Sequence, residues 1–248
     1  MPSYWGHVKR VLQDSDIIIE VLDARLIDQT RNREIEDKVR KSNNKLLFVI
    51  NKCDLVDLEI VKKAQRELQP AVFISSTDKL GTTILKKKIL ELSQGKNVIV
   101  GVLGYPNVGK SSLINALSGR KAALTSPHSG FTHGIQKIRV GAKIMLLDTP
   151  GVFPYGEKDE VLMAKHGSID YSKIKNPEVA ALELIRDYKD LFMSYYGLQT
   201  EDLDEMLEEL AFKTNKLLSG GRPDIDAAAR MVLKDWQTGK ITMKRTQQ

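Results

Sequence analysis

Short apolar runs alternate with charged, amphipathic segments along the N-terminal part of the chain. The apolar runs are rich in β-branched residues, which is typical of buried parallel strands. They span residues 17–22, 46–50, 71–74 and 97–103. The segments with helical spacing span residues 8–13, 31–42, 61–68, 82–93 and 111–117. This alternation predicts an α/β fold with a doubly wound, mostly parallel sheet, in which ligands bind beyond the carboxyl ends of the strands.

The polarity pattern changes after this region. Residues 136–140 and 143–147 predict a β-hairpin closed by a tight turn. Residues 155–177 have mixed polarity and end in a proline, so a domain boundary is expected there. Three helical patterns follow, at residues 177–192, 202–218 and 224–236. We therefore expect a sheet domain of residues 1–165 and a small all-helical C-terminal domain of residues 166–248.

Composition limits the class of protein. The chain of 248 residues is 42% hydrophobic and 28% charged, which indicates a globular protein with a sizeable core. The formal net charge of +6 favours an anionic partner, although a lysine-rich solvated surface explains the same excess. Cys53 is the one cysteine, which excludes internal disulfides and fits a reducing compartment. The sequence shows no secretory segment and no apolar span of membrane length, so we expect a cytoplasmic protein.

Residues 104–111 read Gly-Tyr-Pro-Asn-Val-Gly-Lys-Ser, between an apolar run and a helical pattern. This P-loop spacing wraps nucleotide phosphates, because its backbone N–H groups turn inward and the next helix adds its positive end. Lys110 supplies a point charge to the outer phosphates, and Ser111 holds Mg²⁺. The alternative is a glycine turn before an ordinary helix, which the flanking strand and helix disfavour. The expected nucleotide contacts here are Asn107, Val108, Gly109, Lys110, Ser111 and Ser112.

A second segment on the phosphate side, Asp148-Thr149-Pro150-Gly151, follows the last predicted strand. We expect Asp148 to hold Mg²⁺ through water and the N–H of Gly151 to contact the γ-phosphate. Thr132, in the polar and aperiodic stretch 122–134, is the best second Mg²⁺ ligand, ordered only when a γ-phosphate is present. The alternative is that Thr132 is a surface residue of this loop.

The segment Asn51-Lys52-Cys53-Asp54 has the chemistry of guanine recognition. The carboxylate of Asp54 accepts both N–H groups of the guanine edge, and adenine presents no such pair. Buried hydrogen bonds of this kind discriminate on the order of 10⁴-fold. Asn51 is expected to tie this loop to its neighbours, and the stem of Lys52 to lie over the purine ring. Ser75-Ser76, at the end of the next predicted strand, is expected to brace the base.

The base-reading segment precedes the phosphate loop in the chain, so the motifs are circularly permuted. Together they predict a protein that binds GTP and GDP, with ATP a poor competitor. Val152 stands where GTPases commonly place a glutamine that orients water. Because valine neither donates nor accepts a hydrogen bond, we expect slow intrinsic hydrolysis that depends on help from elsewhere.

This order of motifs resembles the circularly permuted GTPases of the YlqF/RbgA type, and the resemblance covers nearly the whole chain. Trp5-Gly6-His7 resembles the family's N-terminal Pro-Gly-His segment, and Asp23-Ala24-Arg25 resembles its Asp-Ala-Arg motif. Gly220-Gly221 with residues 224–239 resembles its helical C-terminal domain. The resemblance implies a GTPase that uses GTP and Mg²⁺ and acts as an assembly factor on the large ribosomal subunit.

Three residue roles are implied by the resemblance alone. Val152 is the hydrophobic residue that the family carries in place of the catalytic glutamine, Asn107 is a potassium (K⁺) ligand, and His7 is the residue that positions water. In the alternative reading, Asn107 caps its own loop and His7 is structural. The chain departs from the family at residues 127–130 and at Leu26, and both departures bear on switch geometry.

The leading hypothesis is a GTPase switch that binds rRNA or a large ribosomal subunit precursor in its GTP state. In this hypothesis the sheet domain binds and hydrolyses GTP, and the helical domain contacts RNA. One alternative is an RNA-binding scaffold with negligible turnover, and another is a GTPase in a different RNA-linked process such as tRNA modification. We expect a monomer that binds neither DNA nor membrane. The cations available for phosphate contacts are Lys9, Arg10, Arg120, Lys121, Lys137, Arg139, Lys240, Lys244 and Arg245.

Overall fold

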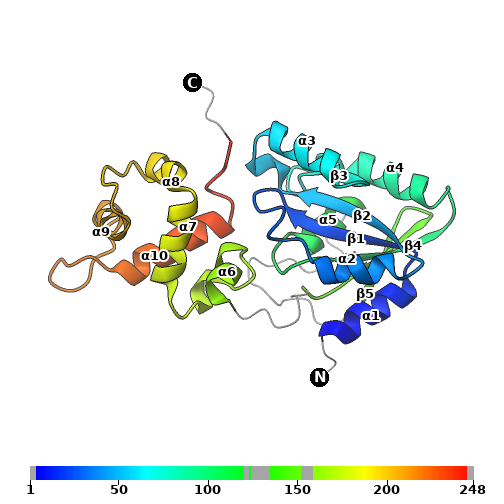
Figure 1. Cartoon of the computed structure of the whole chain (residues 1–248), viewed down its shortest axis with the longest axis horizontal. Helices are drawn as coiled ribbons and strands as arrows, with labels where there is room; N and C mark the ends of the chain where they lie inside the picture. The colour runs from blue at the N-terminus through cyan, green and yellow to red at the C-terminus, as the bar shows by residue number, and fades with distance from the viewer. Residues whose placement is uncertain (1–3, 120–122, 124–134, 152–158, 245–248) are drawn as a thin grey trace. The chain divides into compact units, whose positions relative to one another are not determined.

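The structure, a computed structural model, describes residues 4–119, 123, 135–151 and 159–244 (Figure 1). The chain divides into two compact units. The first consists of Met1–Glu157 with Lys244–Gln248, and the second of Lys158–Met243. A sheet with helices on its faces forms the first unit, and the described elements of the second are helical.

The first unit is organised by a sheet whose described strands follow the order β3-β2-β1-β4-β6-β5. Their bounds are β1 Ile17–Asp23, β2 Lys45–Asn51, β3 Ala71–Phe73, β4 Val98–Leu103, β5 Gln136–Val140 and β6 Ile144–Asp148. β5 pairs antiparallel with β6, and every other described pair is parallel. The doubly wound, mostly parallel sheet expected from the sequence is therefore confirmed.

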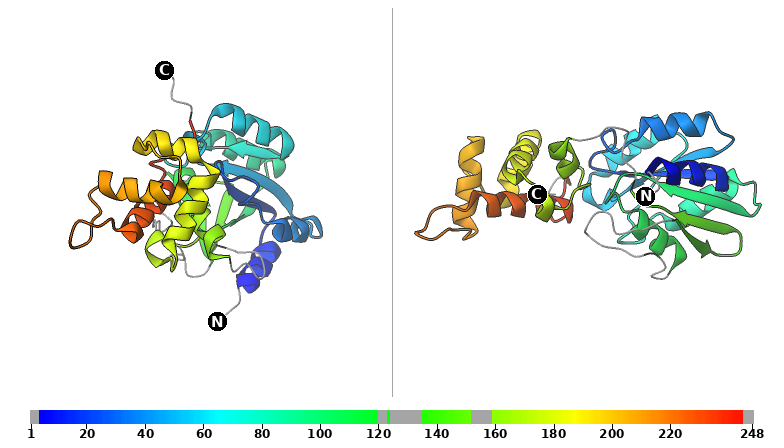
Figure 2. Two further views of the ribbon diagram at one scale, coloured as in Figure 1. Left: turned by 60° about the vertical axis from the view of Figure 1, so that its left-hand side comes forward. Right: turned by 90° about the horizontal axis from the view of Figure 1, so that it is seen from below.

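Helices cover both faces of this sheet. Their bounds are α1 Tyr4–Asp14, α2 Arg33–Arg40, α3 Leu58–Glu67, α4 Thr82–Leu92 and α5 Lys110–Ser118. Successive residues of a strand face opposite sides of a sheet. Ile17 and Ile19 of β1 accordingly lie in a core with α4 and α5, whereas Ile18 lies in a core with α1 and α2. The sheet is thus the middle of three layers (Figure 2).

The motifs singled out from the sequence follow the carboxyl ends of the parallel strands. Asp23 closes β1, Asn51 closes β2 and Asp148 closes β6. Gly104 follows β4 with a φ of 145°, and a β-carbon at this position would lie 2.6 Å from the carbonyl oxygen of Val21. Because parallel strands end at a common edge, these residues gather on one side of the unit despite the permuted order.

The second unit packs around α10. Its helices are α6 Glu160–Lys165, α7 Pro177–Asp187, α8 Lys189–Tyr196, α9 Leu203–Lys213 and α10 Ile225–Gln237. Trp236 of α10 is fully buried, with its ring centroid 5.1 Å from that of Tyr188 and 6.1 Å from that of Phe192. Among the described residues, no helix combines the length and the apolarity needed to cross a membrane.

Two helix predictions in this unit were wrong in extent. Residues 177–192 do not form one helix, because the backbone of Tyr188 leaves the helical region with a φ of −133° and separates α7 from α8. The helix expected to reach residue 218 ends at Lys213. Beyond it, Leu217 pairs with Pro223 in a short antiparallel bridge, which has no place in a continuing helix.

The second unit also begins before residue 166, because α6 is part of its core. The indole N–H of Trp236 donates to the carbonyl of Lys165 at 2.9 Å, and the amide of Gln237 donates to that of Ala164 at 3.0 Å. These bonds bind the carboxyl end of α6 to α10. The sequence boundary between residues 165 and 166 therefore separates two elements that fold together.

Candidate functional site

The phosphate loop lies between β4 and α5, and Lys110 opens α5. The Nζ of Lys110 donates to the carbonyl oxygens of Gly104 at 3.0 Å and of Tyr105 at 2.6 Å, so the side chain folds back across the loop. Burial lowers the pKa of Lys110 to about 8, although the nearby Asp148 opposes the shift. A cation held by two carbonyl oxygens in a buried loop has capacity for a stronger anionic partner.

Asn51 joins the base segment to the phosphate loop. Its Nδ2 donates to the carbonyl of Val108 at 2.9 Å, and its Oδ1 accepts from the N–H of Ser76 at 3.2 Å and from the hydroxyl of Ser76 at 2.8 Å. A β-carbon at Gly109 would lie 2.3 Å from Asn51 Nδ2, at a φ of 98°. Only glycine therefore allows the two loops to approach this closely.

Asp54 follows in a short 3-10 turn, Cys53–Leu55. Its Oδ1 is buried and has no hydrogen-bond partner within the described part of the chain. Asp54 also lines a cavity of about 410 Å³ whose walls include Phe73 and Leu80. Leaving a buried acceptor without a donor costs on the order of 1–3 kcal/mol. A ligand that presents N–H groups at this place would remove that cost.

Asp148 and Ser111 form the phosphate side of the site. Ser111 Oγ donates to Asp148 Oδ2 at 3.3 Å, and Asp148 Oδ1 is buried without a partner among the residues described. Burial raises the pKa of Asp148, and the charge of Lys110 opposes that shift. A carboxylate oxygen with free lone pairs beside a hydroxyl is the hard donor set that Mg²⁺ prefers, so these residues fit the ion.

Gly151 brings the segment after β6 against the phosphate loop. A β-carbon at Gly151 would lie 2.6–2.7 Å from three atoms of Pro106. Thr149 fixes the same segment, because its hydroxyl donates to the carbonyl of Val102 in β4 at 2.7 Å. The Gly151 backbone is thereby held next to the loop that the sequence assigns to phosphate.

The remaining predicted site residues differ in what the structure says of them. Asn107 is half-buried within the phosphate loop at a φ of 60°, and Ser112 is exposed on α5. His7 lies in α1, and its buried Nδ1 has no hydrogen-bond partner in the part of the chain that the structure describes, the site residues included. Thr132 and Val152 lie outside the described residues.

Asp23 and Arg25 form a buried cluster with Lys52 that sequence reasoning missed. The Nζ of Lys52 and an Arg25 nitrogen (NH2) each donate to Asp23 Oδ2 at 2.8 Å. The two serines that follow β3 have different partners. The hydroxyl of Ser76 donates to Asn51, whereas that of Ser75 donates to Asp78 Oδ2 at 3.2 Å. The sequence did offer one indication of the Asp23 cluster. Asp23 lies at the end of one predicted strand, and Lys52 just beyond the end of the next.

The chain is similar to known proteins over nearly its whole length. Residues 99–218 match the family described as 50S ribosome-binding GTPase. An uncharacterized GTP-binding protein of Methanocaldococcus jannaschii is 37% identical over 243 residues, which cover 94% of this chain and 65% of that protein. Nucleolar GTP-binding protein 2 of Saccharomyces cerevisiae is 34% identical over 251 residues, which cover 96% and 52%. The chain thus spans about half to two thirds of the length of these relatives.

Solved structures share the fold. GNP-bound YlqF of T. maritima has a TM-score of 0.68 at 24% identity, over 95% of this chain and 94% of that one. The GDP-bound form of YlqF also gives a TM-score of 0.68, at 23% identity. The shared fold therefore extends over almost the full length of both chains.

Proposed function

Because this chain is a circularly permuted GTPase-domain protein of the YlqF/RbgA type, we propose that it binds GTP and hydrolyses it as a switch in assembly of the large ribosomal subunit. The description of the matched family as ribosome-binding supports the choice of partner. The nucleolar location named for one relative points to the same process, since ribosomal subunits are assembled there.

The observation that carries the proposal is a pair of buried carboxylate oxygens without partners, one on each side of the phosphate loop. Asp54 Oδ1 lies on the base side and Asp148 Oδ1 on the phosphate side, counted among the described residues. Asn51 fixes the spacing between the two sides through its bond to Val108. A guanine nucleotide with Mg²⁺ would satisfy both oxygens, since guanine offers N–H groups and the metal accepts oxygen ligands.

The chain's own residues divide the work of hydrolysis. Lys110 would exchange its two loop carbonyls for phosphate oxygens, and the N–H of Gly151 would donate to the γ-phosphate. Ser111 and Asp148 would hold Mg²⁺, which neutralises charge on the phosphates. Val152 cannot orient water by hydrogen bonding, so the unassisted rate is expected to be slow.

Three further assignments complete the proposal. Thr132 would be the second Mg²⁺ ligand, Asn107 would bind K⁺, and His7 would position the attacking water. The half-buried place of Asn107 within the phosphate loop supports its assignment. The Nδ1 of His7 has no hydrogen-bond partner among the described residues, which supports a role for this nitrogen in bonding a ligand or water. Comparing potassium with sodium, and His7→Ala with the unaltered chain, tests these roles in the hydrolysis measurement that closes the Discussion.

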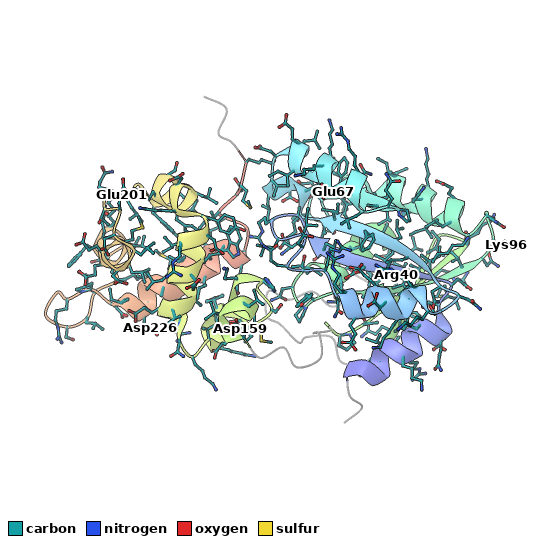
Figure 3. All side chains as sticks on the ribbon, in the orientation of Figure 1. Arg40, Glu67, Lys96, Asp159, Glu201 and Asp226 are labelled. Carbon is teal, nitrogen blue, oxygen red and sulfur yellow. The ribbon has the colours of Figure 1, made fainter. Side chains whose placement is uncertain are left out.

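Charge distribution supports RNA contacts through the first unit rather than through the helical C-terminal unit. Residues 158–243 contain 12 Lys and Arg against 16 Asp and Glu, whereas the remainder contains 26 against 16. The acidic side chains of the second unit include Glu201 and Asp226, labelled in Figure 3. A phosphate backbone is attracted to cations, so the surface with the excess is the better partner. Its exposed cations without an ion pair among the described residues include Lys62, Lys63, Arg66, Lys79 and Lys87.

A scaffold that uses nucleotide only as a conformational ligand is the second function considered. Val152 favours it, because a site without a water-orienting side chain has little intrinsic turnover. Stimulation of hydrolysis by large subunits distinguishes the switch from the scaffold. A third possibility is a GTPase of another RNA-linked process. The identity of the RNA that copurifies at low salt distinguishes this function from ribosome assembly.

The guanine assignment is tested by Asp54→Asn. Xanthine carries a carbonyl where guanine carries an amino group, so an asparagine amide can donate where the carboxylate accepts. We expect the unaltered chain to prefer GDP over XDP, and the variant to lose that preference by about 100-fold or more. Titration calorimetry measures both affinities. Asp37→Asn, at an exposed position of α2 outside the cavity, is the control for loss of charge and should keep the preference for GDP.

A preference for GDP that is the same in Asp54→Asn and in the unaltered chain would contradict the guanine assignment. Equal binding of ADP and GDP by the unaltered chain would contradict it as well.

A further inference from the structure

We infer that Asp23 is a positioning residue for purine binding, which acts by holding Lys52 in place beside the base-reading residues. The inference rests on the proposed guanine-nucleotide site and deepens it. Asp23 itself would not touch the nucleotide, because both of its carboxylate oxygens are taken up by neighbouring side chains. Its contribution to affinity would pass through the one bond that it shares with Lys52.

The contacts of Asp23 form a chain that leads to the base segment. Arg25 forms a bidentate ion pair with this carboxylate. Its Nε donates to Oδ1 at 3.1 Å, and its NH2 donates to Oδ2 at 2.8 Å. The backbone N–H of Arg25 also donates to Oδ1, at 3.0 Å. The Nζ of Lys52 then donates to Oδ2 at 2.8 Å. Arg25 therefore fixes Asp23, and Asp23 fixes the ammonium end of Lys52.

The backbone places the two residues side by side independently of this bond. Asp23 at the end of β1 pairs in register with Asn51 at the end of β2. The N–H of Ala24 donates to the carbonyl of Asn51 at 2.8 Å, one residue before Lys52. The hydroxyl of Thr30 accepts from the N–H of Asp23 at 3.1 Å, which holds the loop that follows β1. The pairing of β1 with β2 therefore brings Asp23 close to Lys52, whether or not their side chains are bonded.

Burial makes this anchor strong. The side chain of Asp23 is fully buried, that of Arg25 is 2% exposed and that of Lys52 is 19% exposed. Burial alone would raise the pKa of Asp23, but Arg25 and Lys52 together lower it well below the usual range. Asp23 is therefore ionised at any working pH. Burial lowers the pKa of Lys52, and the charge of Asp23 opposes that shift and favours the ammonium form.

The backbone of Lys52 explains why an anchor is needed. Its φ of 61° and ψ of 32° are left-handed, which costs a residue with a β-carbon on the order of 1 kcal/mol. Such a conformation persists only where neighbouring contacts enforce it. The left-handed turn lies between Asn51, which holds the phosphate loop, and Asp54, which has the unpartnered carboxylate oxygen. Asp23 holds the side chain of the residue at the centre of that turn.

The inference has a specific signature. The stem of Lys52 contacts any purine ring through its methylene groups, whereas Asp54 reads the guanine edge. Loss of the Asp23 anchor should therefore weaken binding of GDP and IDP by the same factor, because inosine keeps the ring and lacks the amino group. Loss of Asp54 should weaken the two by different factors. A defect that passes through Lys52 is thereby distinguished from one that passes through Asp54.

A double-mutant cycle tests the inference in the full chain, with affinities for GDP and IDP measured by calorimetry. Asp23→Asn and Lys52→Met each remove one end of the bond, and Lys52→Met keeps the hydrocarbon stem. Each single change is expected to weaken GDP binding by about tenfold, and the double variant by about the same factor rather than about 100-fold. The ratio of GDP to IDP affinity should stay unchanged in all three.

Glu36→Gln is the matched control, since Glu36 accepts from Arg31 at 2.7 Å and is similarly buried, but lies in α2. It should lower the melting temperature and leave GDP affinity unchanged. If Asp23→Asn does not fold because two buried cations lose their partner, Asp23→Glu takes its place in the same cycle. Its carboxylate keeps the charge and displaces the anchor by one methylene group.

The inference would be overturned by multiplicative losses in the double variant, by a change in the ratio of GDP to IDP affinity, or by an equal affinity loss in Glu36→Gln. Failure of the unaltered chain to bind GDP would overturn the proposed function and this inference together. Binding of GDP without coupling between Asp23 and Lys52 would overturn the inference alone.

Discussion

At the scale of single residues, the site consists of buried polar groups that are only partly satisfied by the chain itself. Lys110 is held by two loop carbonyls, and the free oxygens of Asp54 and Asp148 have no partner within the described part of the chain. Buried groups in this condition raise the free energy of the nucleotide-free protein. Part of the free energy of nucleotide binding is therefore expected to come from satisfying them.

We expect the titration of Lys110 to make nucleotide binding depend on pH. Burial lowers its pKa to about 8 in the structure without nucleotide, and phosphate anions would raise it again because they favour the charged form. Binding therefore takes up a proton near and above that pH, and GDP affinity should fall as pH rises through about 8, approaching tenfold per pH unit. Calorimetry in buffers of different ionisation enthalpy measures both the proton uptake and the affinity.

Lys110→Arg is the control for this titration, because guanidinium stays charged throughout the range. The variant should bind GDP more weakly, with a flatter affinity profile between pH 7 and about 9.5. Identical pH profiles for the variant and the unaltered chain would show that Lys110 is not the group that titrates.

Single residues were predicted well where a motif fixes their backbone, and poorly where a contact joins distant parts of the chain. The glycine at position 109 follows from the spacing of the phosphate loop, and its contact with Asn51 follows from the fold. The bond between Asp23 and Lys52 joins residues 29 positions apart. Its existence depends on a side-chain conformation that periodicity and spacing do not encode.

At the scale of elements, the described residues of the candidate nucleotide site lie at the carboxyl ends of the parallel strands. Buried parallel strands have long β-branched runs, so their positions were predicted to within a few residues. Helices of the second unit were harder to delimit. The break at Tyr188 and the end of α9 at Lys213 depend on packing around Trp236 and on the hairpin that contains Leu217. Apolar spacing continues through both places, so the sequence pattern alone extends each helix too far.

The two ends of α5 provide a prediction at this scale. Gly109 precedes the helix and Gly119 follows it, and both have left-handed backbones, with φ values of 98° and 72°. An added β-carbon at Gly109 would collide with Asn51, whereas at Gly119 nothing lies within 4 Å. Gly109→Ala should therefore weaken GDP binding by about 10- to 100-fold, because backbone strain adds to the broken bond between Asn51 and Val108.

Gly119→Ala is the matched control, and it should lower stability by about 1 kcal/mol without changing GDP affinity. Fluorescence titration with a labelled GDP and thermal melting separate the two effects. Equal GDP affinity in both variants would show that contact between the loops does not govern binding.

At the scale of the whole molecule, two compact units differ in charge as well as in architecture. Composition alone gives the net charge of +6, but it conceals an excess of Lys and Arg in the first unit and of Asp and Glu in the second. The sequence boundary at residue 165 left α6 in the wrong unit, because its bonds to Trp236 and Gln237 span about 70 residues. Because the helical unit is acidic, the proposed contacts with RNA are expected in the first unit, which also carries the proposed nucleotide site.

The most direct test of the central claim is GTP hydrolysis by the purified chain, with and without large ribosomal subunits. We expect slow hydrolysis by the chain alone and strong stimulation by the subunits, which weakens as salt rises because phosphate contacts are screened. Stimulation should also need potassium rather than sodium and fall in His7→Ala. GTP binding without stimulated hydrolysis in any of these conditions would contradict the account of a GTPase switch in assembly of the large subunit.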